Sequence, residues 1–222
     1  EPVTPALSPP RRTQEQRRTG TIARLVEATI SSLVEVGYAG TSVKEICGRS
    51  GVSHGGLFRH FETRLDLIVA ATEEVSKRQI ILFQERFASQ PEGEEVLLTA
   101  VRLLRDACRE PINAAWYEVL VASRTDEHLR RRVGPAVERF YAEIGTLAAR
   151  LPGSEDYPPE LFETLVFTLV SVFDGEALVR AVHPMPDLEA RRLDLAVAVL
   201  ESHRHQEVRQ APSLEGWSPR QK

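Results

Sequence analysis

The sequence predicts an all-α protein of about nine helices, and three observations support this prediction. Apolar side chains recur at three- and four-residue spacings, alternating strand patterns are absent, and glycines and prolines fall between the periodic segments. The chain has 222 residues, of which 42% are hydrophobic and 27% charged, an ordinary composition for a globular protein. We expect a helical N-terminal domain followed by a larger helical C-terminal domain.

The composition also excludes several classes of protein. With 28 Lys and Arg against 32 Asp and Glu, the net charge of −4 excludes a uniformly basic coat but allows a local basic patch. Cys47 and Cys108 are too few for a zinc cluster, and two lone thiols suggest a reducing compartment. The most apolar stretch, 165–173, has about half the roughly 20 residues of a membrane span. We therefore expect a soluble, cytoplasmic protein that needs no metal or other cofactor.

Two polar tails flank the expected domains. Residues 1–12 and 206–222 are rich in proline or poor in apolar side chains, so we expect both to be disordered. Residues 13–76 are expected to form the N-terminal domain and residues 77–205 the C-terminal domain. The C-terminal helices are predicted at about 96–108, 111–123, 126–150, 159–182 and 187–205.

The N-terminal domain is predicted to begin with a long helix over about 13–36, which Gly37 ends. Two short helices follow it, separated by Gly51. Ser42 is the expected N-cap of the first short helix and Ser53 that of the second. A fourth helix is expected to start a few residues later.

The stretch 41–61 has the most informative pattern in the chain. Two short amphipathic helices meet there at Gly51-Val52-Ser53, which is the helix-turn-helix arrangement. In this motif the first helix braces against the DNA backbone while the second enters the major groove. Residues 11–64 hold nine Lys or Arg and five Glu, so the basic excess lies where phosphates would be met. A helical hairpin within a protein core is the alternative interpretation.

A longer series of residues with fixed spacings runs through about 18–70. The series is Glu35-Val36-Gly37-Tyr38, Thr41-Ser42-Val43, Ile46, Gly51-Val52-Ser53, Gly55, Leu57, Phe58, His60, Phe61, Arg64 and Leu67. It resembles the DNA-binding domain of the tetracycline-repressor (TetR) family of bacterial transcription regulators. The resemblance implies an N-terminal three-helix helix-turn-helix domain and a larger helical domain for ligand binding and dimerisation.

The resemblance also implies which side chains would meet DNA phosphates. Thr41 and Ser42 lie at the N-terminus of the second helix, where the helix dipole and unpaired N–H groups favour anions. His60 stands where the family usually has a phosphate-contacting His. Arg64 replaces the usual Lys at the start of the fourth helix and is expected to contact phosphate equally well.

Base reading is expected to fall to fewer side chains than is common in the family. Gly56 replaces a frequent Thr, and Phe58 replaces the common Tyr, whose hydroxyl would bond phosphate. His54 and Arg59 are therefore the best candidates for base edges, Arg59 with guanine. The complete set expected at the DNA is Thr41, Ser42, Ser53, His54, Gly55, Arg59, His60 and Arg64.

The last two predicted helices, 159–182 and 187–205, are apolar on more than one face. Such a pair needs a second partner, which a two-fold mate supplies as a four-helix interface. A monomeric core is the alternative. The residues expected at the interface are Leu165, Leu169, Val172, Leu193, Val197 and Leu200.

Aromatic residues in the C-terminal half are candidates for the lining of a ligand cavity. Trp116 and Tyr117 point about 100° apart on one helix, so at most one of them is expected to face it. Such a cavity suits a small, mostly apolar effector, although core packing is the alternative for each aromatic residue. The candidate lining residues are Trp116, Tyr117, Phe140 and Phe167, with Arg105 as a polar group.

These observations together predict a ligand-responsive transcriptional regulator, expected to be a repressor. It would bind a palindromic double-stranded DNA operator as a homodimer and be released by a small molecule. The sequence contains none of the patterns GxxxxGK[ST], GxGxxG or HExxH, and we identify no catalytic residue. Two alternatives remain open: a helix-turn-helix protein without a ligand, and an all-α enzyme or interaction module.

Overall fold

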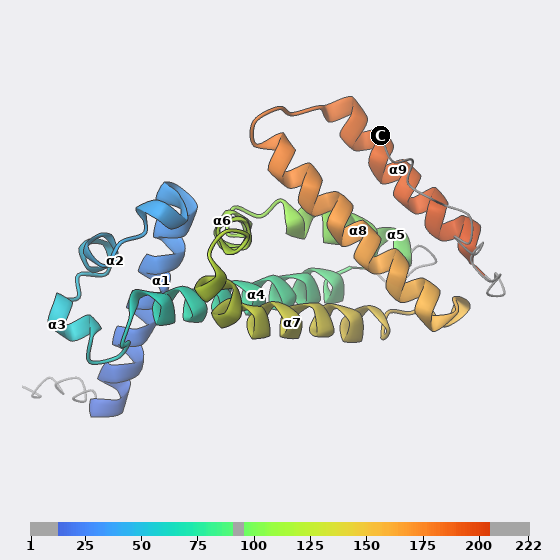
Figure 1. The fold of residues 1–222 in the computed structure, drawn as a ribbon. Helices are drawn as coiled ribbons and strands as arrows, with labels where there is room; N and C mark the ends of the chain where they lie inside the picture. The colour runs from blue at the N-terminus through green and yellow to red at the C-terminus, as the bar shows by residue number, and fades with distance from the viewer. Residues whose placement is uncertain (1–12, 91–95, 205–222) are drawn as a thin grey trace, which may run out of the picture. The chain divides into compact units, whose positions relative to one another are not determined.

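The computed structural model describes residues 13–90 and 96–204, which form nine α-helices, one 3-10 turn and no strand (Figure 1). The predicted all-α class is confirmed, whereas the two predicted tails lie mostly or wholly outside the described residues. The helices are α1 (Gln14–Gly40), α2 (Val43–Ser50), α3 (His54–Leu57), α4 (Arg64–Ala88), α5 (Val96–Cys108), α6 (Asn113–Ser123), α7 (Glu127–Ala148), α8 (Pro159–Arg180) and α9 (Pro186–His203), with the 3-10 turn at Ser154–Asp156.

The chain folds into two compact units. The first contains the residues up to Arg78 together with Glu110–Glu138, and the second contains Gln79–Arg109 and the residues from Arg139 on. Helix α6 and the first part of α7 thus belong to the same unit as α1, α2 and α3. The first division between the two units, after Arg78, lies close to the predicted boundary at residue 76. The separate functions of the two predicted domains stay predictions.

The core of the first unit lies under the two short helices. Leu25 of α1, Ile46 of α2, Leu57 of α3 and Leu67 of α4 are fully buried in one cluster, which Val52 of the turn completes. Full burial of such a side chain contributes about 1.5–3 kcal/mol. Each helix therefore adds its apolar stripe to a shared core and leaves its opposite face exposed.

Local signals in the sequence set the ends of these short helices, as predicted. The Oγ of Ser42 accepts the Glu45 N–H at 3.1 Å, and the Oγ of Ser53 accepts the Gly56 N–H at 3.1 Å. Gly51 ends α2 in the left-handed conformation, with φ 64° and ψ 19°. A serine hydroxyl at the N-cap satisfies one of the backbone donors that a helix leaves unpaired.

The second unit is built on α8 and α9, which lie side by side and pack against α5 (Figure 1). Its fully buried centre is Phe173 of α8, and the Tyr157 hydroxyl donates to the Leu200 carbonyl at 3.0 Å. The buried cluster comprises Val101, Cys108, Ala148, Tyr157, Phe162, Leu165, Leu169, Phe173, Ala196 and Leu200.

This cluster corrects the predicted dimer interface. Leu165, Leu169 and Leu200 are core residues of the protomer, and Leu193 and Val197 pack against that core. Among the six predicted interface residues, only Val172 is exposed, at 37%. The prediction is corrected for Leu165, Leu169 and Leu200, because helical periodicity shows which residues share a stripe but not which stripe meets the protomer's own core. Leu193 and Val197 are only partly buried, so their place at the interface stays a prediction.

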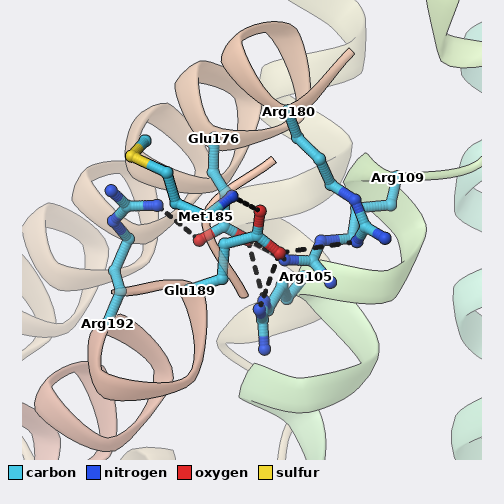
Figure 2. Close-up of polar contacts among 7 residues, drawn as sticks. All are labelled: Arg105, Arg109, Glu176, Arg180, Met185, Glu189 and Arg192. Atoms are coloured by element: carbon cyan, nitrogen blue, oxygen red, sulfur yellow. Dashed lines mark hydrogen bonds and ion pairs between the residues drawn. The ribbon is translucent and has the colours of Figure 1, made fainter. Parts of the chain in front are cut away.

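A buried group of ion pairs joins α5, α8 and α9 within the second unit (Figure 2). Its centre is Glu176 of α8, whose side chain is only 2% exposed. The Glu176 carboxylate accepts hydrogen bonds from Arg105 at 2.8 Å, from Arg192 at 2.5 Å and from Arg109. These three donors compensate the loss of water around a charge that would otherwise be costly to bury.

A second buried carboxylate, that of Glu189 in α9, completes the group. It accepts the Met185 N–H at 3.0 Å and a hydrogen bond from Arg109 at 2.9 Å. Arg180 lies 3.6 Å away, on the solvent side of the group. We call Arg105, Arg109, Glu176, Arg180, Glu189 and Arg192 the arginine–glutamate cluster.

The cluster shifts the protonation of Glu176. Burial alone would raise the pKa of this carboxyl, but the hydrogen bonds from Arg105, Arg192 and Arg109 outweigh burial and hold the pKa below its ordinary value. A carboxyl with a lowered pKa in the folded state stabilises the fold above its unfolded-state pKa. That contribution is lost as the pH falls through the folded-state pKa.

Replacing Glu176 is therefore expected to destabilise the second unit in a pH-dependent way. Glu176→Gln leaves three guanidinium groups without their shared charge, so we expect the free energy of unfolding near pH 7 to fall by about 3–5 kcal/mol. The difference from the unmodified protein should shrink as the pH is lowered through the folded-state pKa of Glu176, because the carboxyl is then protonated. Denaturant unfolding across this range measures both effects.

The control for this experiment is Glu143→Gln, at an exposed glutamate of α7 in the same unit. We expect it to change the free energy of unfolding by less than about 0.5 kcal/mol at either pH. A loss of stability by Glu176→Gln that is the same at both pH values would contradict the assigned role of the charge.

Candidate functional site

The exposed surface of the helix-turn-helix is formed by α3 and the residues around it. Ser53, His54, Gly55, Phe58 and Arg59 are all exposed, while the apolar side of the same turn faces the core of the first unit. This arrangement leaves one face of α3 available to DNA. Apart from Phe58, these residues are the ones that the sequence predicted at the groove.

The position of α2 and α3 depends on a tight turn at the end of α1. Gly37 has φ 71° and ψ 179°, a conformation that is essentially restricted to glycine. The carboxylate of Glu118, from α6, accepts the Tyr38 N–H at 2.9 Å. A Cβ atom at Gly37 would lie 2.7 Å from the same carboxylate oxygen, so any larger residue would displace Glu118.

Arg64 fixes the start of α4 to this turn. Its guanidinium donates to the carbonyl oxygens of Tyr38 and Thr41 and lies 4.4 Å from the centre of the Tyr38 ring. The role of Arg64 in the structure is thus to position the helix-turn-helix. A guanidinium has five N–H donors, and the two carbonyls do not use all of them. Contact of the remaining N–H groups of Arg64 with phosphate stays a prediction.

The structure contradicts the phosphate contact predicted for Thr41. The Thr41 side chain is fully buried, and its hydroxyl donates to the Gly37 carbonyl at 2.7 Å and accepts from Ser32 at 2.9 Å. The Gly37 carbonyl also accepts the Thr41 N–H at 3.1 Å, so the backbone and the side chain of Thr41 both bond to it. Thr41 therefore closes the turn, and Ser42, the next residue, is the exposed one.

Two further residues complete the predicted phosphate side of the motif. His60 is half-buried, and its Nδ1 atom has no hydrogen-bond partner in the described part of the chain. Lys44, in the first turn of α2, is exposed beside Ser42 and was missed by the sequence reasoning. Its position two residues after the N-cap Ser42 is the sequence signal that could have identified it. The contacts of His60 and Ser42 with phosphate stay predictions.

Helices α6 and α7 are bonded to the helix-turn-helix within the first unit. Arg132 of α7 pairs with Asp66 of α4, which also accepts the Thr63 N–H at 2.8 Å. Burial would raise the pKa of Asp66, but the bonds from Arg132 and Thr63 lower it. Asp126 caps α7 and lies 3.5 Å from the Tyr38 hydroxyl, at the limit of a hydrogen bond.

The predicted ligand-lining residues do not gather in one unit. Trp116 and Tyr117 are both buried in the first unit, at 2% and 9% exposure, whereas Phe140 and Phe167 belong to the second. Arg105 is also in the second unit, but its Nε is bonded to Glu176. Its assignment as a polar group lining a cavity is therefore corrected: it neutralises a buried carboxylate.

An aromatic group nevertheless forms within the second unit. Tyr141 of α7 lies between Phe140 and Phe167, with ring centres 5.9 and 5.7 Å apart. Burial raises the pKa of the Tyr141 hydroxyl, and the nearby charge of Asp174 adds to that shift. Burial also raises the pKa of the Cys108 thiol, which is hydrogen-bonded to Asp174. The group thus combines apolar rings with a few polar atoms, as small-molecule sites do.

Comparison with known proteins identifies the family. The sequence model of the bacterial regulatory proteins of the tetR family matches residues 25–71, from the middle of α1 into α4. The HTH-type transcriptional regulator Rv2912c of Mycobacterium tuberculosis is 43% identical over 189 residues, which are 85% of this chain and 97% of the relative. The chain belongs to the tetR family. It is a DNA-binding transcriptional regulator, and the resemblance noted in the sequence is confirmed.

Another regulator and two solved structures are similar over most of the chain. CymR of Pseudomonas putida is 31% identical over 152 residues, which are 65% of this chain and 73% of CymR. A transcriptional regulator of Pseudomonas aeruginosa has a TM-score of 0.65 at 25% identity, covering 90% of this chain and 97% of its own. The multidrug binding protein EbrR, complexed with malachite green, has a TM-score of 0.58 at 24% identity, covering 82% and 97%.

Two other properties concern the described residues as a whole. Within 13–90 and 96–204, no helix is long and apolar enough to cross a membrane. The same ranges contain no group of three His, Cys, Asp or Glu side chains that could hold a metal ion.

Removing the guanidinium of Arg64 is expected to destabilise the protein before any DNA is added. Arg64→Gln removes two charge-assisted hydrogen bonds and the contact with the Tyr38 ring, so the free energy of unfolding should fall by about 1.5–3 kcal/mol. Thermal and denaturant unfolding of the DNA-free protein measure this. Arg59→Gln, at an exposed arginine of the same face, is the control and should leave stability unchanged. Unchanged stability of Arg64→Gln would leave phosphate contact as the role of Arg64.

Proposed function

We propose that this tetR-family regulator is a ligand-responsive repressor, which binds a palindromic operator as a homodimer and is released by a small molecule. The observation that carries the proposal is the exposed face of α3, which follows the α1–α2 turn that Glu118 of α6 and Arg64 of α4 bond. A pre-positioned recognition helix is what a major-groove reader requires.

On DNA, α3 lies in the major groove and α2 braces against the backbone. His54 and Arg59 reach base edges, while Ser42, Lys44 and His60 meet phosphates. The basic excess over residues 11–64 supplies the electrostatic part of the affinity, which falls as salt rises. The acidic remainder of the chain then lies away from the phosphates.

The dimer forms through the outer faces of α8 and α9, opposite the protomer core. One stripe of α8 is exposed, and none of its members is charged; Val172 and Val179 are 37% and 49% exposed. Val182, in the turn directly after α8, is 89% exposed. On α9, Leu188 and Leu195 are exposed at 38% and 64%. Two adjacent helices with such faces fit a four-helix interface with a two-fold mate. The α8 stripe is Thr164, Thr168, Val172, Gly175 and Val179.

A charge on this stripe is expected to separate the protomers. Val172→Asp buries a carboxylate without a partner in the dimer, so the variant should sediment as a monomer and lose affinity for a palindrome. Val121→Asp is the matched control, because Val121 of α6 is 55% exposed and lies outside the stripe. Both variants should unfold at the temperature of the unmodified protein. Dimers that survive both Val172→Asp and Val179→Asp would move the interface elsewhere.

The effector site that we propose includes the aromatic group around Tyr141 and Phe167 in the second unit. EbrR, a structural neighbour, is a multidrug binding protein whose complexes contain imidazole and malachite green. Helix α7 carries Tyr141 and also Arg132, which is bonded to Asp66 at the start of α4. A displacement of α7 on effector binding would therefore reach the helix-turn-helix, and release from DNA follows as a population shift.

Malachite green is a suitable first probe for this site, followed by a panel of apolar metabolites. A compound that binds should raise the free energy of unfolding by about 2.7 kcal/mol at a hundredfold excess over its Kd, and should release the protein from DNA. Phe167→Ala should weaken that binding by about two- to tenfold, since an aromatic contact contributes about 0.5–1.5 kcal/mol. Thermal shift and DNA release measure the two effects.

The control for the effector experiment is Phe58→Ala, an exposed aromatic residue of α3 in the first unit. Its thermal shift with malachite green should equal that of the unmodified protein. Stabilisation only by highly charged compounds would contradict an apolar site, and stabilisation by no compound would favour a helix-turn-helix protein without a ligand.

A further inference from the structure

The DNA-facing surface of α3 carries an exposed phenylalanine that the fold does not use. Phe58 is 41% exposed and lies outside the buried cluster of the first unit. Its ring packs against the ring of His54, one helical turn earlier, with centres 4.8 Å apart and planes inclined by 60°. The two rings form a pair that projects from the surface, and the packing limits the rotation of the Phe58 ring.

The residues beside this ring pair have no side chain or a buried one, so the rings stand out from the surface. Gly55 and Gly56 have no side chains, and a side chain at Gly55 would meet no atom within 4 Å in the described part of the chain. Leu57 is fully buried and points into the core. The ring of Phe58 is therefore the large exposed apolar group on a face whose other large exposed side chains are His54 and Arg59.

The chemistry of the major groove offers one kind of apolar partner for such a ring. The base edges there present hydrogen-bond donors and acceptors, which a phenyl ring does not match, and the C5 methyl group of thymine. Phe58 has no hydroxyl, so it also makes no hydrogen bond to a phosphate oxygen. An apolar ring on a groove-facing surface is thus complementary to a thymine methyl group.

We propose that Phe58, held in place by the His54 ring, contacts a thymine methyl group in each half-site and so determines part of the sequence specificity. The proposal rests on the proposed position of α3 in the major groove. The contact removes both the ring and the methyl group from water, and it favours thymine over the other bases at that position.

The test uses a duplex selected from a random library by the full-length protein, with each thymine then replaced in turn by deoxyuridine. Uracil keeps the hydrogen-bonding edge of thymine and lacks only the methyl group. We expect one position in each half-site at which the replacement weakens binding about fourfold, which corresponds to the burial of one methyl group. Replacement in both half-sites should weaken binding by about the square of that factor.

Variants of the protein assign this effect to Phe58. Phe58→Ser should bind the thymine and uracil duplexes equally, whereas Phe58→Tyr keeps a ring and should keep the preference. Arg59→Ala is the matched control on the same face, because it should weaken binding yet retain the preference for the methyl group. Phe58 is exposed, so its variants should unfold at the unmodified temperature.

Each outcome is informative. Failure to select any duplex would overturn the proposed operator binding, and with it this inference. A selected duplex without thymine under α3, or one whose uracil forms bind as tightly as the parent, would overturn the inference alone. The same is true if Phe58→Ser retains the full preference for thymine.

Discussion

The helix-turn-helix depends on the turn that links α1 to α2, because two other helices, α4 and α6, bond to its backbone. Glu118 of α6 accepts the Tyr38 N–H, and Arg64 of α4 donates to the carbonyls of Tyr38 and Thr41. Gly37 makes this possible, since its conformation is restricted to glycine and a Cβ there would displace the Glu118 carboxylate. The apolar core beneath α2 and α3 supplies stability, and these directional bonds fix the start of α4 and the carboxylate of α6 to the turn before α2.

In the second unit, hydrogen-bonded ion pairs around buried side chains hold the helices together. Its buried carboxylates, Glu176 and Glu189, find their charge partners within the unit. The cluster joins α5, α8 and α9 from the inside, so the outer faces of α8 and α9 need no charged side chains to hold the helices together. Those faces therefore tolerate uncharged stripes such as that around Val172. Cohesion within the protomer and association between protomers thus use opposite sides of the same two helices.

The sequence predicted well those features of the fold that interactions between neighbouring residues determine. The caps at Ser42 and Ser53 and the left-handed Gly51 follow from interactions within a few residues, and all three are present. Thr41 was misassigned because its hydroxyl turns inward to Gly37 and Ser32, which its position at a helix N-terminus does not indicate. Leu165 was misassigned because its partners depend on rotation about the helix axis. Periodicity places Leu165 on an apolar stripe, but only the packed structure shows that the stripe faces the protomer core. The roles of Glu118 and Arg64 in the turn also required tertiary structure.

The two proposed features, a sparse reading surface and a two-fold dimer, are linked by the arithmetic of specificity. With glycine at positions 55 and 56, α3 offers few side chains to the bases, and each good base contact discriminates by only about 1–3 kcal/mol. A single half-site would then be distinguished poorly from the many competing sites in a genome. Two-fold symmetry doubles every base contact and so squares the discrimination, provided that the recognition helices are about 34–36 Å apart, or a near multiple. An effector that changed this spacing would remove the doubled part of the specificity while leaving each helix-turn-helix intact.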